Sequence, residues 1–469
     1  MRVQTIRVAA ALLAACSGVA MPLQGAAQAV PGGTFAIRGA TVVIGDGSEP
    51  IPGGTVLVRA GRVVAAGAQV PVPAGIPVID GTGKWVSPGV VMPVTDLGLV
   101  DVDGVSESND TGASKARFSA GLDVAPAIDP DAQPLKVARA AGITRAAIAP
   151  SAATALFAGQ GALITLSATA PTVEKARAFQ FVELGENGGK LAGGSRVAAA
   201  AELRNALSEA RAIAAPAAVR SGRQRVTVAP TTAPSEPDPR LAEGRPARPT
   251  DVLLTRFDAA ALVPVVRGRQ PLFVHVERMA DIRAALALRQ DFPALRLVLV
   301  GVSEGWRVAP EIAAAGVPVI ANPMTDLPQT FEFVAATQSN AGRMVRAGVQ
   351  VAIGNQAGTD QPRYARQYAG NLVALTRVPG ATGLGWGQAF AAISSVPAAI
   401  LGEGAHYGSL LPGRAADLVV WDGDPLELGS GALAVWIDGV QQPVDNHQTR
   451  LRDRYRQPQN TVLPPAYTR

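Results

Sequence analysis

The chain has 469 residues, enough for one large α/β domain together with a smaller one. Hydrophobic residues make up 48% and charged residues 17%, a balance that excludes an intrinsically disordered chain. The formal charge of +5 is spread along the sequence without a long basic run, so we expect no nucleic-acid partner.

The N-terminal segment has the pattern of an export signal. Two arginines precede a short apolar run, 8–15, that is too short to span a bilayer. An Ala-x-Ala site then predicts a signal peptide over 1–29, cleaved after Ala29, and a periplasmic or secreted protein. The alternative is a lipoprotein, since Leu-Ala-Ala before Cys16 resembles a bacterial lipobox and would tether the chain to a membrane. Cys16 is the only cysteine, so cleavage after Ala29 excludes disulfides and cysteine nucleophiles.

Short strands are expected between residues 34 and 80. The segment 54–67 reads as a hairpin whose two Val-rich runs are joined by Ala60-Gly61. Such a hairpin cannot bury its own face and needs further strands. Strand patterns that can supply them occur near the other end, at 413–425 and 432–439. The sequence therefore predicts one small β-sandwich built from residues 30–85 and 401–445, followed by a tail over 446–469.

The segment 84–100 follows, and the rest of the chain is organised around it. Pro88-Gly89 marks a tight turn, and Val90-Val91-Met92 is a short apolar run typical of a buried parallel strand.

Apolar runs and Ala-rich helical patterns then alternate, which predicts βα units around a parallel sheet. Strands are expected at 142–150, 272–276, 295–300, 316–320 and 349–353, with helices at 279–289, up to about 315, and at 386–393. We interpret 86–400 as a (β/α)₈ barrel whose functional residues follow the carboxyl ends of its strands. Residues 157–162 read as a Gly-rich turn, and the Pro-rich segment 221–250 as a flexible insertion.

Two of these segments resemble the amidohydrolase superfamily, specifically the imidazolonepropionase-related group. One is the first strand with its Pro-Gly and Leu-Gly-Leu frame, and the other is Pro-Gly-Arg-x-Ala-Asp-Leu-Val-Val at 412–420. The resemblance covers most of the chain. It implies a barrel beside a composite β-domain, and hydrolysis of a non-peptide carbon–nitrogen bond in a cyclic amide or related small molecule. It also implies a divalent metal, such as zinc, that acidifies a water molecule.

The residues that would carry this chemistry are mostly replaced. Where the family has Asp and then His-x-His after the first strand, this chain has Met92, Val94 and Asp96. His275 matches the ligand position after the fifth strand, although a lone histidine on a strand is often structural. The next histidine would fall at Gly301 or Val302.

Other candidates lie near these positions. Glu304 could bind a metal or cap the helix that follows it. The final aspartate of the family is replaced by Gln356, which cannot act as a carboxylate base, and Asp360 lies four residues further on. His406 and His447 are far from these positions in the sequence. The candidate metal ligands are therefore His275, Asp96 and Glu304.

Two functions follow from this conflict. The first is a hydrolase with a degenerate metal site, and the second is a catalytically inactive binding or scaffold protein of the periplasm. A zinc site needs at least three protein ligands, so we predict that no divalent metal is tightly bound. In both cases the partner is a small molecule, and the sequence leaves its identity and the oligomeric state open.

Overall fold

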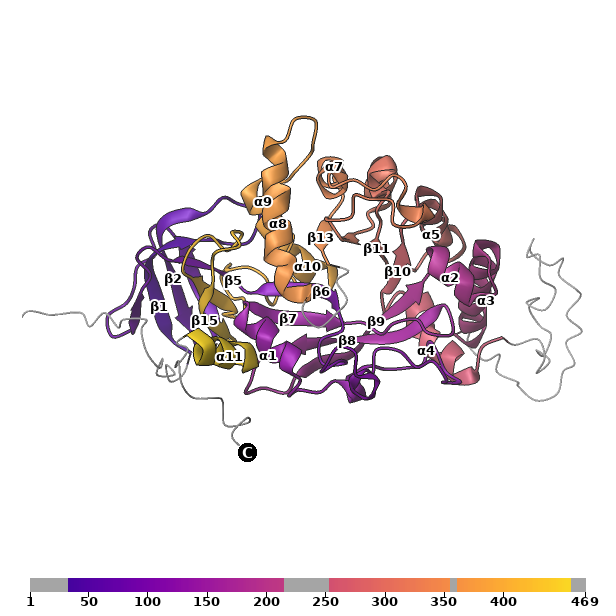
Figure 1. The fold of residues 1–469 in the computed structure, drawn as a ribbon, viewed down its shortest axis with the longest axis horizontal. Coiled ribbons are helices and arrows are strands. Elements are labelled where there is room, and N and C mark those ends of the chain that lie inside the picture. Colours follow the sequence, from indigo (N-terminus) through magenta and orange to yellow (C-terminus); the bar gives the residue numbers. More distant parts are fainter. Residues whose placement is uncertain (1–32, 215–252, 355–360, 457–469) are drawn as a thin grey trace, which may run out of the picture.

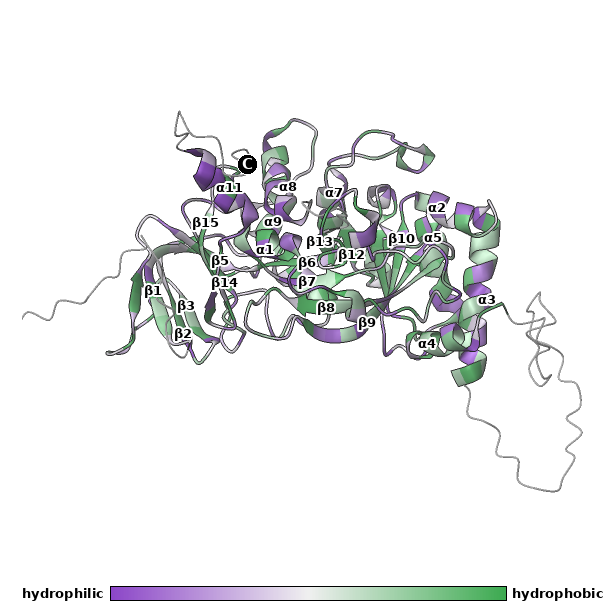
Figure 2. Cartoon of the chain, turned by 60° about the horizontal axis from the view of Figure 1, so that its bottom comes forward, coloured by the Kyte–Doolittle hydropathy of each residue, from purple (hydrophilic) through white to green (hydrophobic). Residues whose placement is uncertain are grey.

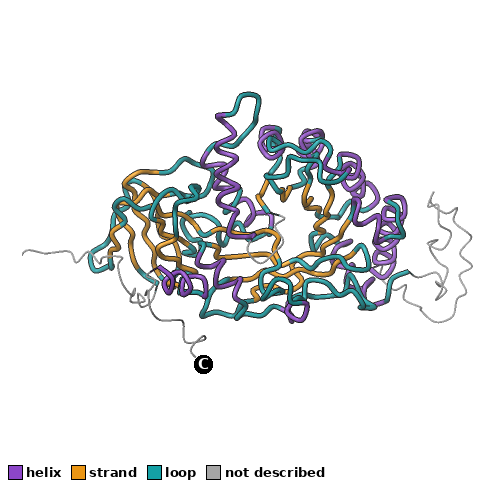
Figure 3. The backbone as a smooth tube through the Cα atoms, in the orientation of Figure 1, coloured by secondary structure: helices purple, strands orange, loops and turns teal. Residues whose placement is uncertain are grey.

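The computed structural model describes residues 33–214, 253–354 and 361–456 (Figure 1). The expected signal peptide, the insertion at 221–250, Gln356 and Asp360 lie outside these ranges. The strands form two eight-stranded sheets, which Figure 3 shows as two separate groups.

Both ends of the chain build the first sheet, as predicted. Its strands are β1 (Phe35–Val42), β2 (Ile51–Arg59), β3 (Arg62–Gly67), β4 (Val78–Asp80), β5 (Trp85–Pro88), β14 (Leu418–Trp421), β15 (Ala432–Ile437) and β16 (Val440–Gln442). The two ends meet where β5 pairs with β14 in antiparallel and with β1 in parallel orientation. Because β5 belongs to this sheet, the change to the second sheet falls at Gly89, slightly after the expected boundary at 85.

The first sheet has a hydrophobic core of its own. Buried apolar residues of β1–β3, β5, β14 and β15 form one cluster, in which the rings of Phe35 and Trp436 lie 5.4 Å apart. The predicted hairpin is β2–β3, and its turn residues Ala60 and Gly61 have φ of 48° and 74°. Positive φ at both central residues is the geometry that matches the twist of a two-residue hairpin.

The second sheet is the barrel. Its strands are β6 (Val90–Thr95), β7 (Ile143–Ile148), β8 (Phe157–Thr165), β9 (Val173–Glu183), β10 (Leu272–Val276), β11 (Leu297–Gly301), β12 (Val319–Ala321) and β13 (Val351–Ile353), in that order around the sheet. All neighbours are parallel except at β8, which runs antiparallel to β7 and β9. Every residue of β6 and β7 is buried, as expected for strands covered on both faces.

The Gly-rich segment at 157–162 is a strand, so its interpretation as a turn is wrong. A side chain at Gly161 would overlap the ring of Phe179 on the neighbouring strand β9. A glycine inside a strand often allows another group to approach closely, and Gly161 allows this for the Phe179 ring.

The barrel is closed by a connecting segment instead of a direct strand pair. The Val91 N–H of β6 donates to the Ile393 carbonyl, and the Ile353 N–H of β13 donates to the Ala392 carbonyl, both at 2.9 Å. Pro93 has no N–H to donate, and it lies in β6, an edge strand of the hydrogen-bonded sheet, where proline is tolerated.

The helices lie mostly on the outside of the barrel, except α11 (His447–Arg456), which lies beside β15 of the first sheet (Figure 1). They are α1 (Gln133–Ala140), α2 (Gly185–Leu191), α3 (Arg196–Ala214), α4 (Arg256–Val266), α5 (Met279–Asp291), α6 (Ala309–Ala315), α7 (Asn340–Arg346), α8 (Ala365–Ala374), α9 (Trp386–Ala391), α10 (Ser395–Ile400) and α11 (His447–Arg456). Figure 2 shows apolar residues concentrated on the barrel strands and hydrophilic residues on α11. Within the described ranges, none of these helices combines the length and the apolar character needed to cross a bilayer.

Candidate functional site

A cavity of about 240 Å³ opens at the carboxyl ends of the barrel strands. Functional residues of α/β barrels gather at this end, because the loops that follow the strands meet there. The polar residues lining it come from the ends of four different strands and the segments after them: Thr95, Asp96, Ser151, Glu183, Asn187 and His275. The volume lies just below the range of about 300–1,000 Å³ that is common for small-molecule sites.

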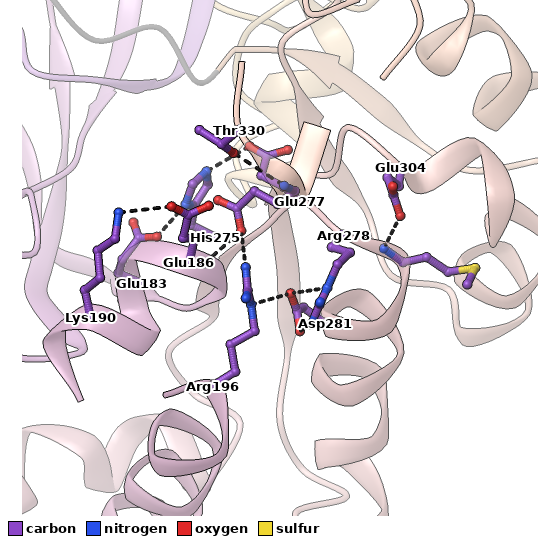
Figure 4. A network of polar contacts seen from close by, with 12 residues as sticks. Glu183, Glu186, Lys190, Arg196, His275, Glu277, Arg278, Asp281, Glu304 and Thr330 are labelled. Atoms are coloured by element: carbon purple, nitrogen blue, oxygen red, sulfur yellow. Dashed lines mark hydrogen bonds and ion pairs between the residues drawn. The ribbon is translucent and has the colours of Figure 1, made fainter. Parts of the chain in front are cut away.

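His275 is held between two carboxylates. It lies opposite Glu183 in the register of β9 and β10, and its Nδ1 is 2.7 Å from Glu183 Oε1. Its Nε2 is 3.0 Å from Oε1 of Glu277, two residues further along the same chain segment (Figure 4). Both ring nitrogens can donate only when the imidazole is protonated, so the arrangement favours an imidazolium ion.

Burial alone would lower the pKa of His275, but the charges and hydrogen bonds of Glu183 and Glu277 outweigh it and raise this pKa well above its usual value of 6.5. At neutral pH the imidazole of His275 is therefore held in its positively charged form.

This raised pKa gives a pH-dependent contribution to stability. The contribution is fully present below the unfolded value near 6.5 and is lost as the pH rises through the higher folded value. We expect His275→Gln to lower the melting temperature more at about pH 6 than at about pH 10. Differential scanning calorimetry of both proteins at the two pH values measures this, and an effect that grows toward alkaline pH would contradict it.

Glu277 occupies the space that a side chain at Gly301, the last residue of β11, would need. Its Oε2 accepts hydrogen bonds from the N–H of Ser303 at 2.8 Å and from the Ser303 hydroxyl at 2.6 Å. A Cβ atom on Gly301 would overlap its Oε1. Gly301 and Val302 have φ of 88° and 59°, and this sharp turn carries Ser303 to the carboxylate. A left-handed, β-branched Val302 is a rare conformation of the kind found at functional sites.

Asp96 is brought to the same cavity as His275, as the sequence suggested. Val94 lines the cavity as well and is 8% exposed, whereas Met92 is fully buried in the main core. Apolar side chains, those of Met92 and Val94, therefore stand at two of the three positions where the family resemblance predicts Asp or His.

Glu304 is not part of the cavity. Its Oε2 accepts a hydrogen bond from the N–H of Met279, the first residue of α5, at 2.9 Å. Figure 4 shows it beside the start of this helix and apart from His275. The expectation that Glu304 caps the helix that follows it is therefore wrong, because no side-chain cap forms at that helical turn and the carboxylate binds the start of α5 instead.

A metal centre of the family type does not fit this arrangement. The only histidine in the cavity lining has both ring nitrogens bonded to carboxylates, and the place of a second histidine is filled by Glu277. In the described part of the chain, no three His, Cys, Asp or Glu side chains are grouped to hold a metal ion. No step of the chemistry below is therefore assigned to a metal.

Glu183 and Glu277 were not among the predicted site residues. Glu183 ends β9, one strand before His275, so its place after an apolar run was a usable signal. Glu277 is two residues after His275, and side chains two apart along a strand share one face.

Comparisons with known proteins find similar sequences and a similar fold. The profile of the Amidohydrolase family matches residues 303–442. A crystal structure of an amidohydrolase from Thermotoga maritima MSB8 has a TM-score of 0.71 at 22% identity, over 87% of this chain and 99% of that one, which shows a common fold. Amidohydrolase tasK of Hapsidospora irregularis is 39% identical over 83 residues, which are 18% of this chain and only 8% of that protein. Residues 303–442 therefore match the Amidohydrolase family, and the chain as a whole shares the fold of a solved amidohydrolase.

Proposed function

We propose that this protein is a hydrolase acting on a carbon–nitrogen bond of a small, non-peptide molecule, such as a cyclic amide. The observation that carries the proposal is the cavity at the carboxyl ends of the strands, where Asp96, Glu183 and His275 converge in a chain with the fold of an amidohydrolase. Membership of the imidazolonepropionase-related branch remains a prediction.

The residues present suggest how such a site would work. Hydrolysis of an amide needs a base that takes a proton from water and a donor that protonates the leaving nitrogen. The carboxylates of Asp96 and Glu183 are the candidate bases, and the one that takes the proton from water would, once protonated, return it to the leaving nitrogen. The positive charge on His275 would lie near the oxygen that becomes negative in the transition state, which is the kind of electrostatic stabilisation that lowers barriers most.

A second function, binding without turnover, is favoured by one specific observation. Both ring nitrogens of His275 are already bonded to carboxylates, so the imidazole has no free donor for a substrate. A rigid, paired histidine would serve a binding or scaffold protein equally well.

Turnover of a panel of cyclic amides and related small molecules separates the two functions. For a hydrolase we expect Glu183→Gln to reduce kcat by roughly 10²–10⁴-fold, the usual loss of a general base, with little change in binding. For a binding protein we expect thermal stabilisation by panel members without hydrolysis, and no change in any rate on His275→Ala.

The metal content is a separate prediction. Protein purified without chelator and then dialysed should hold no stoichiometric zinc or manganese, because His275 is saturated by Glu183 and Glu277. Elemental analysis measures this. About one equivalent that survives dialysis and is lost in His275→Ala would restore the metal-dependent hydrolase.

We also propose export to the periplasm or beyond. The support is the signal-like segment at 1–29, which lies outside the described residues. A mature N-terminus at Val30 is expected, and incorporation of labelled palmitate that Cys16→Ser abolishes would favour the lipoprotein instead.

A further inference from the structure

A second and larger cavity, of about 320 Å³, lies between the barrel and the first sheet. Its walls come from β7, β9 and the segment at 403–407 on one side, and from β3 and the β15–β16 turn on the other. Glu174 near the start of β9 lines this cavity, whereas Glu183 at the end of β9 lines the barrel mouth. Nine residues of extended strand separate the two by roughly 30 Å, so the cavities are distinct.

Arg145 lines this cavity, and most of its N–H donors are already bonded to carboxylates. Its side chain is 4% exposed and makes a two-point contact with Asp417, with Nε–Oδ2 at 2.7 Å and Nη2–Oδ1 at 3.0 Å. It also pairs with Glu174, and its Nη2 is 2.9 Å from Asp438 Oδ2. One buried cation thus faces three carboxylates, of which Asp438 is 54% exposed, and four of the five N–H groups of Arg145 are bonded to them, which leaves one for a further acceptor.

Glu403 adds a fourth carboxylate, 19% exposed, at the cavity wall. Its partners lie toward solvent: His406 Nδ1 is 2.6 Å from Oε2, and Lys175 Nζ, on a side chain 54% exposed, is 3.8 Å from Oε1. Arg62 is also exposed and donates to the Gly413 carbonyl. Exposed cations are screened by water and salt, so the inner part of the cavity carries an excess of negative charge.

The ionisation of Glu174 agrees with this excess. Burial raises the pKa of its carboxyl group, Arg145 lowers it, and the charges of Asp417, Asp438 and Glu403 raise it again, with a net rise. One further cation in the cavity would relieve this repulsion.

Tyr407 supplies an independent sign of a ligand. Its side chain lines the cavity and is 5% exposed, with the Arg145 guanidinium 5.1 Å from the centre of its ring. Within the described part of the chain its hydroxyl group forms no hydrogen bond, and its oxygen is not among the fully enclosed polar atoms, so it is open to the cavity and available to a ligand or to water.

We propose that this cavity binds a small organic cation with a primary ammonium or guanidinium group. The N–H groups of the ligand would donate to Glu403, Glu174 and the Tyr407 hydroxyl. Leu163 and Ala415 provide apolar wall for a short alkyl part. The proposal is independent of what happens at the barrel mouth.

Isothermal titration of the full-length protein with n-propylammonium chloride at constant ionic strength tests this proposal. Saturable binding is expected, while n-propanol and sodium propionate should not bind. Tyr407→Phe removes one hydrogen bond and should weaken binding by about 5-fold, and Glu403→Gln, which removes a charged acceptor, by about 10-fold or more.

Two controls locate the effect. Glu311→Gln alters an exposed carboxylate paired with Arg283 far along the chain, and His275→Ala alters the barrel mouth, so both should keep wild-type affinity for propylammonium. Circular dichroism confirms that each variant is folded. The proposal is overturned if propylammonium fails to saturate the protein, if propanol binds equally well, or if the affinity responds to His275 and not to Tyr407.

Discussion

Replacing Arg145 by methionine should cost about 3–5 kcal/mol of stability, the usual result of removing one partner from a buried ion pair. Asp417 is 2% exposed and would be left buried without its two-point partner. Asp417 also accepts a hydrogen bond from the Asp438 N–H at 2.8 Å, so the change reaches from β7 into the β15–β16 turn. The loss should therefore weaken the junction of the two sheets as well as the barrel.

The expected fall in melting temperature is roughly 3–5 °C for a chain of this size. Arg283→Met is the matched control, because Arg283 and Glu311 form a salt bridge between side chains that are 48% and 45% exposed. Exposed pairs contribute little, so the control should melt close to the wild type. Calorimetry of the three proteins at one pH decides the matter, and equal melting temperatures for both variants would show that the Arg145 cluster does not stabilise the junction.

The architecture could be predicted because its signals are local and repeated. A hairpin at 54–67 too small to bury its own face required partners, and β14 and β15 were the strand patterns left to supply them. The β8 strand escaped prediction because glycines at 159 and 161 signal a turn in sequence, whereas in the fold they make room for Leu122 and for the ring of Phe179. Whether a glycine serves a turn or a close approach depends on residues far away in the chain.

The candidate site was predicted only in part, for a similar reason. His275 and Asp96 follow strands and reach one cavity, as their positions suggested. Glu304 also follows a strand, yet the turn at Val302 directs it to the start of α5. The partners of His275 depend on strand register, since Glu183 is its neighbour only because β9 and β10 pair as they do.

Replacing Gly301 by alanine should destabilise the protein by roughly 2–5 kcal/mol, the sum of left-handed strain and overpacking. Its φ is 88°, and the added methyl group would overlap the carboxylate of Glu277, which cannot move without losing Ser303 and His275. Gly316 is the matched control, because its φ is 61° and a Cβ there would meet nothing within 4 Å. Gly316→Ala should therefore show the strain alone, about 1–2 kcal/mol.

A double-mutant cycle with Glu277→Ala isolates the overlap from the strain. In that background the cost of Gly301→Ala should fall to the level of the Gly316 control, because the group it collides with is gone. Gly301→His, which places a histidine at one of the two positions where the family resemblance predicts one, should be destabilising for the same reason and should not create a zinc site while Glu277 is present. Denaturant unfolding of the four proteins of the cycle measures the coupling. A Gly301→Ala cost equal to that of Gly316→Ala in the wild-type background would mean that Glu277 does not fill this position, and the argument against a second histidine ligand would fail.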